Sequence, residues 1–179
     1  MYGVFLQSKW KLSLRFFVLS LFLVVGCSKI PQISNPPTHS DLVIWMGRGS
    51  CMENCPAYEI TITGDGTVTF TGWLNVEVLG TRSATISQNE IEQLIAEFNN
   101  ANFFELDKIQ SETRDCPSTG ISITLEGKSK RYQDYRLCSK ETLPYEKKIQ
   151  RLEMKIDELS NSQQWLGDSA VKALRNLWQ

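Results

Sequence analysis

Apolar and polar residues alternate in several short stretches of the chain, which is the period of a β-strand with one buried face. Residues 58–63 and 67–71 show this period most clearly, and Gly64-Asp65-Gly66 between them is typical of a hairpin turn. A second turn is expected at Gly127. The pattern predicts six strands, at residues 42–46, 58–63, 67–71, 76–85, 121–125 and 131–135.

Other stretches carry apolar residues three and four positions apart, as one face of a helix does. The first begins at Ser87-Gln88-Asn89-Glu90, a capping box in which Ser87 and Glu90 bond to each other's backbone. The second begins near Pro144, and a shorter one covers residues 169–178. The apolar positions of the two longer helices are Ile91, Leu94, Ile95 and Phe98, and Tyr145, Ile149, Leu152, Ile156 and Leu159.

The order of these elements determines the expected fold class. Strands joined by short turns are antiparallel, and helices at the ends of such runs cover one face of the sheet. We therefore expect an α+β fold. It has an antiparallel sheet made of a meander and a hairpin, two main helices packed on one face, and a short C-terminal helix.

The N-terminus has the pattern of an export signal. Lys9, Lys11 and Arg15 precede a short apolar run, and no acidic residue occurs before residue 27. The run ends in Val-Val-Gly26-Cys27, which resembles the lipobox of bacterial lipoproteins, where the Cys thiol takes the lipid. An ordinary signal peptide or an uncleaved anchor is the alternative. Because the residue after Cys27 is Ser and not Asp, a Gram-negative host is expected to place the protein in the outer membrane, facing the periplasm.

These features predict the domain organisation. Residues 1–26 form the signal peptide, and 27–40 form the lipidated Cys with a flexible, Pro-rich tether that contains the only histidine, His39. Residues 41–162 form one α+β domain, followed by a helical extension at 163–179. Residues 27–179 hold 16 Lys and Arg against 20 Asp and Glu, a net charge of about −4, which argues against nucleic-acid binding.

Four further cysteines allow three disulfide pairings. If the hairpin turn is centred on Gly127, Cys116 and Cys138 face each other across its open end, which leaves Cys51 and Cys55 as a second disulfide. An exported compartment favours disulfides, but free thiols at Cys51 and Cys55 stay possible. Zinc is the less favoured alternative because the spacing lacks two close pairs, and thioredoxin-like chemistry requires one residue fewer between the cysteines. We expect no metal and no cofactor.

A possible recognition surface gathers near these cysteines. Its residues are Arg48, Glu53, Tyr58, Asp134 and Tyr135. A lone histidine in a tether is ordinarily a solvated residue, so catalysis by Ser-His-Asp or Cys-His is not expected. We therefore expect that the protein is not an enzyme.

The stretch from Arg48 to Tyr58 resembles the opening motif of a bacterial family, domain-of-unknown-function family 6438. In that motif Cys, three residues, Cys-Pro, one residue and Tyr precede an alternating strand and Asp-Gly. The resemblance covers about residues 42–160. It includes Asp65-Gly66, Val68, Phe70, Leu94, Phe98, Phe103-Phe104, Asp134-Tyr135 and Ile156-Asp157. The family occurs mostly in secreted proteins and lipoproteins, so the resemblance implies a fold and an address but no activity.

Three functional hypotheses follow. The first is a membrane-anchored envelope lipoprotein, a non-catalytic binding or structural module held by the lipid on Cys27, whose further partner is an unknown protein or small ligand. The second is a thiol-redox or other envelope enzyme that uses the region of Cys51 and Cys55. The third is an inhibitor or assembly factor of an envelope protein.

Overall fold

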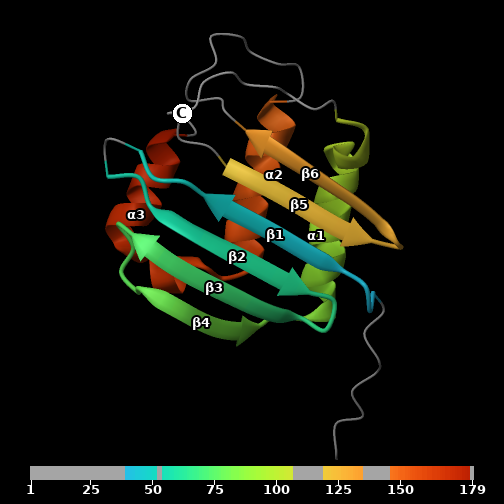
Figure 1. The fold of residues 1–179 in the computed structure, drawn as a ribbon, viewed down its shortest axis with the longest axis horizontal. Helices are drawn as coiled ribbons and strands as arrows, with labels where there is room; N and C mark the ends of the chain where they lie inside the picture. The colour runs from blue at the N-terminus through green and yellow to red at the C-terminus, as the bar shows by residue number, and fades with distance from the viewer. Residues whose placement is uncertain (1–38, 52–53, 107–118, 135–145, 178–179) are drawn as a thin grey trace, which may run out of the picture. The chain divides into compact units, whose positions relative to one another are not determined.

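One antiparallel sheet organises the part of the chain that the computed structural model describes, which is residues 39–51, 54–106, 119–134 and 146–177 (Figure 1). The strand order is β4-β3-β2-β1-β5-β6. The strands are β1 (Val43–Arg48), β2 (Ala57–Thr63), β3 (Thr67–Leu74), β4 (Gly80–Thr85), β5 (Thr119–Leu125) and β6 (Lys128–Asp134). The meander β2–β3–β4 and the hairpin β5–β6 lie on either side of β1, so the first strand is central.

The helices cover one face of this sheet, as the hydrophobic pattern predicts (Figure 1). They are α1 (Gln88–Asn100), the 3-10 helix η1 (Phe103–Glu105), α2 (Glu146–Leu159) and α3 (Gln163–Leu177). Alternate strand residues point into the core, and the apolar stripes of α1 and α2 pack against them. The predicted α+β fold class is confirmed.

Helix α1 has the predicted start. The Glu90 backbone N–H donates to Ser87 Oγ at 3.3 Å, and the Ser87 backbone N–H donates to the Glu90 carboxylate at 2.6 Å. On the solvent side, Arg151 of α2 donates two hydrogen bonds of 2.8 Å to Glu97 of α1. The two helices are therefore joined by an exposed ion pair in addition to their apolar contact.

Two details of the strands differ from the prediction. Val76 and Val78, predicted within the third meander strand, lie in the connection before β4 and pack against the core. The β5–β6 turn is centred between Glu126 and Gly127, so Gly120 pairs with Gln133 rather than with Asp134. The register is one residue off the prediction that placed Cys116 opposite Cys138, and both cysteines lie outside the described residues.

The chain is already part of the fold at His39, which the sequence places in the tether. The backbone N–H of Leu42 donates to the His39 carbonyl at 3.1 Å, and His39 Nε2 lies 3.0 Å from Glu92 Oε1 on α1. The side chain of His39 thus contacts α1, while its carbonyl closes a turn with Leu42 before β1.

Helix α3 is longer than the predicted segment and belongs to the same core. The ring centroid of Trp165 on α3 lies 5.2 Å from that of Phe70 on β3, and Leu166 and Leu174 of the same helix are also buried. The helix is interrupted at Gly167, whose φ of 78° is costly for other residues. A Cβ there would also lie 2.7 Å from the Glu77 carboxylate, so glycine lets the β3–β4 connection approach α3 closely.

No described helix covers the opposite face of the sheet (Figure 1). Trp45 lies near its centre, where the ring packs over Gly47 and Gly120; a Cβ on Gly47 would come within 2.5 Å of that ring. The Trp45 indole N–H donates to Glu59 at 3.1 Å, and the Arg131 guanidinium lies 4.4 Å from the ring centroid. The cation–π pair of Arg131 and Trp45 therefore lies over the point where Gly47 of β1 pairs with Gly120 of β5.

Candidate functional site

Arg48 is the last residue of β1 and points to the helix-covered face, as Ile44 and Met46 do. It pairs with Tyr58 of β2 on one side and with Thr119 of β5 on the other. Only 6% of Arg48 is exposed. A guanidinium in this position requires compensation, because removing a charge from water is expensive.

The compensation comes from both layers of the fold. Arg48 donates from Nε to the Tyr58 hydroxyl at 2.8 Å and from Nη1 to Thr119 Oγ1 at 3.1 Å. Across the interface it donates to Glu153 Oε2 at 3.1 Å and to Asp157 Oδ2 at 3.0 Å, both on α2. Three strands and one helix are thereby joined through a single planar cation, and charge-assisted bonds of this kind are the strong ones.

Tyr58 and Ser162 complete the arrangement around Asp157. The Tyr58 hydroxyl donates to Asp157 Oδ1 at 2.7 Å, and Ser162 Oγ donates to the same oxygen at 3.1 Å. Both side chains are fully buried. We call Arg48, Tyr58, Glu153, Asp157 and Ser162 the Arg48 cluster.

The protonation states in the Arg48 cluster follow from its surroundings. Burial raises the pKa of Tyr58 well above its ordinary value, and Asp157 adds to this although Arg48 opposes it. Tyr58 therefore stays a neutral phenol that donates to Asp157. Burial alone would lower the pKa of Arg48, but Tyr58, Asp157 and Glu153 together raise it well above its ordinary value. The cluster thus holds a permanent cation against carboxyl groups, which favours a structural role.

The Cys51–Cys55 disulfide follows β1 directly. The Cα atoms of the two cysteines are 5.3 Å apart, and the structure contains the disulfide that the sequence predicts between them. The Cys55 carbonyl accepts a 3.1 Å hydrogen bond from Asn75 Nδ2 in the β3–β4 connection. The disulfide therefore closes the β1–β2 connection, and the Asn75 hydrogen bond joins this connection to the β3–β4 connection.

The five residues of the predicted recognition surface do not form one exposed surface in the described part of the chain. Arg48 and Tyr58 are buried in the Arg48 cluster, so these two side chains cannot contact a partner on the surface. Their burial follows from the alternation of strand residues, because Arg48 and Tyr58 both point to the face of the sheet that α2 covers. The backbone of Asp134, in β6, pairs with Thr119 of β5. The side chain of Asp134 and all of Glu53 and Tyr135 lie outside the described residues. So does Cys27.

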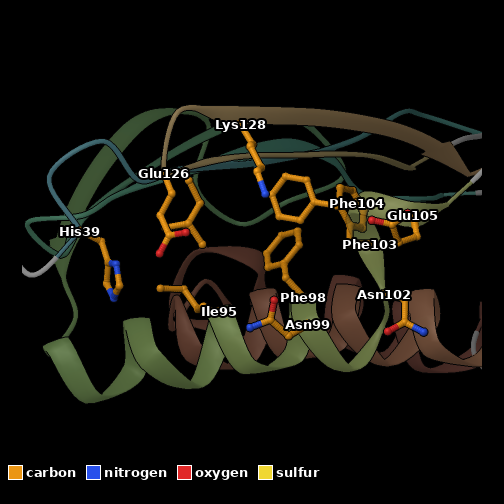
Figure 2. Close-up of a pocket in the computed structure, with 11 residues that line it drawn as sticks. His39, Ile95, Phe98, Asn99, Asn102, Phe103, Phe104, Glu105, Glu126 and Lys128 are labelled. Carbon is orange, nitrogen blue, oxygen red and sulfur yellow. The ribbon is translucent and has the colours of Figure 1, made fainter.

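A groove of about 360 Å³ lies between α1, η1 and the β5–β6 turn (Figure 2). Pockets for small ligands begin at about 300 Å³, so the groove suits a small molecule. Its apolar lining consists of Ile95, Phe98, Phe103, Phe104 and Leu125. The ring centroids of Phe98 and Phe103 are 5.0 Å apart in an edge-to-face arrangement, which is a favourable geometry for an aromatic pair.

Polar side chains, among them charged ones of both signs, surround this apolar lining. Figure 2 shows Lys128 and Glu126 extending from the turn toward α1, with Asn99 on the opposite side. Neither Lys128 nor Glu126 forms an ion pair with a residue of the described ranges. These groups are available to a ligand, whereas those of the Arg48 cluster are engaged with one another.

The described side chains bring together no group of three or more His, Cys, Asp or Glu that could hold a metal ion. Nor does any helix in the same part of the chain have the length and apolar character that a bilayer crossing requires.

Comparison with known families gives one match. The sequence model of a family described as Domain of unknown function (DUF6438) matches residues 42–160, about two thirds of the chain. The chain belongs to the DUF6438 family. No curated protein matches it. The DUF6438 match begins just before β1 and ends just after α2, so it contains four members of the Arg48 cluster, while Ser162 and α3 lie beyond it.

Glu153 and Asp157 are the site residues that the sequence reading missed. They lie four residues apart on α2, on the same side as Ile149, Leu152 and Ile156. Two acidic residues inside an apolar stripe are unusual, because carboxylates are rarely fully buried unless paired. Together with Arg48 at the end of an alternating strand, that signal could have indicated a buried ion pair.

Replacing Arg48 tests the structural role of the cluster. Arg48→Ala removes the guanidinium that donates to the buried Glu153 and Asp157 carboxylates, so we expect the free energy of unfolding to fall by about 3–5 kcal/mol. Arg151→Ala is the matched control, because it breaks an exposed Arg–carboxylate pair whose contribution is about 1 kcal/mol or less. Urea denaturation of the purified oxidised proteins measures both. Equal small losses for the two variants would contradict a structural role.

Proposed function

We propose that this chain is an exported lipoprotein of the cell envelope whose DUF6438 domain binds a ligand or partner and does not catalyse a reaction. The observation that carries the proposal is the basic and apolar N-terminal run that ends in Gly26-Cys27. Acylation of Cys27 would hold the domain at a membrane, which is the outer membrane facing the periplasm if the host is Gram-negative.

The Cys51–Cys55 disulfide supports the exported location. Such bonds persist in oxidising compartments and are rare in the cytosol. In this chain the bond closes the connection beside the Arg48 cluster, at the corner where Cys55 also contacts Asn75. A domain that is stabilised in this way is suited to the envelope.

The contrast between two polar sites supports binding over catalysis. The Arg48 cluster is buried, and its members bond to one another. The groove beside α1 has an apolar lining and two charges of opposite sign, Lys128 and Glu126, which form no ion pair with another described residue. This combination suits a small zwitterionic molecule with an apolar body.

Substitution of Cys27 tests the anchor. We expect the native protein to begin at an acylated Cys27 and to fractionate with membranes, whereas Cys27→Ser takes no lipid and keeps its first 26 residues, because the thiol is the acceptor. Intact-mass analysis and labelling with a fatty-acid analogue measure the difference. The matched control is Cys51→Ser, which keeps the acceptor and is expected to be labelled. An unmodified native chain that begins at Met1 in the cytosol would overturn the proposal.

The dipeptide phenylalanyl-alanine tests the groove, because it carries one ring, one ammonium and one carboxylate. We expect weak binding, with a Kd on the order of 1 mM for a ligand of this size. Lys128→Met should weaken binding by about 1.5- to fivefold, the contribution of one exposed ion pair. Lys172→Met, which removes an exposed Lys from α3, is the control and should change nothing. Nuclear magnetic resonance titration gives the three values, and binding unaffected by Lys128→Met would exclude this site.

A thiol-redox function is the second candidate, and the Cys51–Cys55 bond is the observation that favours it. The two functions differ in the expected reduction potential. A structural disulfide lies below about −300 mV, whereas catalytic pairs lie well above that value. We expect the lower potential, measured by equilibration in thiol buffers with Cys51→Ser as the reference for the assignment. A potential of about −200 mV would favour the enzyme.

A further inference from the structure

Exposed apolar side chains are concentrated at one corner of the sheet. Of the five large hydrophobic side chains that are exposed in the described residues, three lie within residues 73–79. The exposed fractions are 53% for Trp73, 49% for Leu74 and 60% for Leu79. We call these three residues the corner patch. The other two, Val43 and Met154, lie on β1 and α2. A grouping of this kind marks an interaction surface more often than scattered apolar residues do.

The backbone that carries the corner patch is fixed to the rest of the fold. The N–H groups of Glu77 and Val78 donate to the carbonyls of Leu166 and Trp165 on α3, each at 3.0 Å. Val78 itself is half-buried against the core. The β3–β4 connection therefore packs Val76 and Val78 against the core and exposes Leu79. Because α3 holds the backbone of this connection by hydrogen bonds, Leu79 is exposed in a defined conformation.

A β-bulge sets the position of Trp73. Tyr58 pairs with Gly72, but Ala57 pairs with Leu74, so Trp73 is the extra residue of β3. Bulges re-aim side chains at the edges of sheets. The bulge breaks the alternation that would otherwise turn one of Trp73 and Leu74 into the core.

The residue types at the corner favour a lipid surface as the partner. Trp is enriched at the level of lipid headgroups, because its ring is apolar and its N–H is polar, and Leu inserts into the acyl region. Residues 73–79 contain no Lys or Arg, and their one acid, Glu77, lies against Gly167 of α3. The contact would depend on apolar burial, which fits a mature chain of net charge about −4 that anionic lipids do not attract.

The length of the tether makes this contact possible. Eleven residues, 28–38, separate Cys27 from His39 and can span about 34 Å when extended. The corner patch lies at the far end of β3 from the strand ends near Val43, where the chain enters the sheet. The eight residues of β3 span about 27 Å. A chain anchored at Cys27 can therefore bring this corner to the bilayer that holds its lipid.

We propose that Trp73, Leu74 and Leu79 form a second membrane contact, which inserts into the headgroup region of the bilayer that carries the acyl anchor. The inference rests on the proposed lipoprotein anchor and adds an orientation to it. With both contacts made, the domain lies along the membrane instead of swinging freely on its tether.

Fluorescence quenching of the full acylated chain tests the inference. The protein is reconstituted in vesicles of phosphatidylethanolamine and phosphatidylglycerol that contain a phosphatidylcholine brominated near the glycerol end of its acyl chains. The Trp73 signal is the difference between the native chain and Trp73→Phe. We expect the brominated lipid to reduce it by about half or more, and aqueous acrylamide to quench it only weakly. A Trp73 signal that acrylamide quenches and the brominated lipid does not would overturn the inference.

Two further reporters serve as a second test and a matched control. In the Trp73→Phe background, Leu79→Trp places an indole elsewhere in the corner patch, and Met154→Trp places one on α2, where Met154 is 42% exposed. We expect the brominated lipid to quench the first reporter and not the second. Equal quenching of both would overturn the inference, as would a Trp73 signal that is shielded in native envelopes but not in vesicles, since a protein partner would then cover the corner.

The N-terminal mass, measured on the same sample, separates this inference from the proposed function. An acylated chain whose Trp73 signal is not quenched by lipid overturns the membrane contact alone. A chain without lipid on Cys27 overturns both, because the contact depends on the anchor.

Discussion

The buried guanidinium of Arg48 is the constraint on which the arrangement of the two layers depends. Apolar packing alone would let α2 slide or rotate on the sheet, since hydrophobic contact is not directional. Arg48 instead requires Glu153 and Asp157 at one place over β1, with Tyr58 and Thr119 beside it. A misplaced helix would leave charges buried and unpaired, which costs more than lost packing. The DUF6438 match contains Arg48 and these four residues that it contacts, and it ends just after α2.

The sequence predicts most of this fold because most of the fold is periodic. Alternation identifies β2 and β3, and the stripe of Ile91, Leu94 and Phe98 identifies α1 with its capping box. The central place of β1 could not be read in this way, since strand order depends on long-range pairing. Val76 and Val78 look like strand residues, but α3 supplies the partners for this segment. The β5–β6 turn is centred between Glu126 and Gly127 and not on Gly127, and this small difference shifts the pairing of the two strands by one residue.

The candidate site was predictable only in part, and for a physical reason. Arg48 and Tyr58 were recognised as notable residues, but polar character alone suggests exposure, and only the position of α2 makes them interior. The groove joins Ile95, Phe104 and Lys128 from three separate elements, so no local motif could reveal it. The fold therefore has a buried polar cluster for stability, an open groove suited to a ligand, and an apolar corner at Trp73, and each is built from different elements.

A double-mutant cycle on Arg48 and Asp157 tests the central claim most directly. Arg48→Met, Asp157→Leu and the combined variant are compared with the native chain by urea denaturation. Arg48→Met leaves the Asp157 carboxylate buried without its cation, and Asp157→Leu leaves Arg48 with Glu153 as its carboxylate on α2. If the ion pair positions α2, the combined change removes both members of the Arg48–Asp157 pair, and Glu153 loses its contact with Arg48. We then predict a coupling energy of about 2 kcal/mol or more, with the double variant more stable than the simple sum of the losses. Losses that add to within about 0.5 kcal/mol would contradict the account.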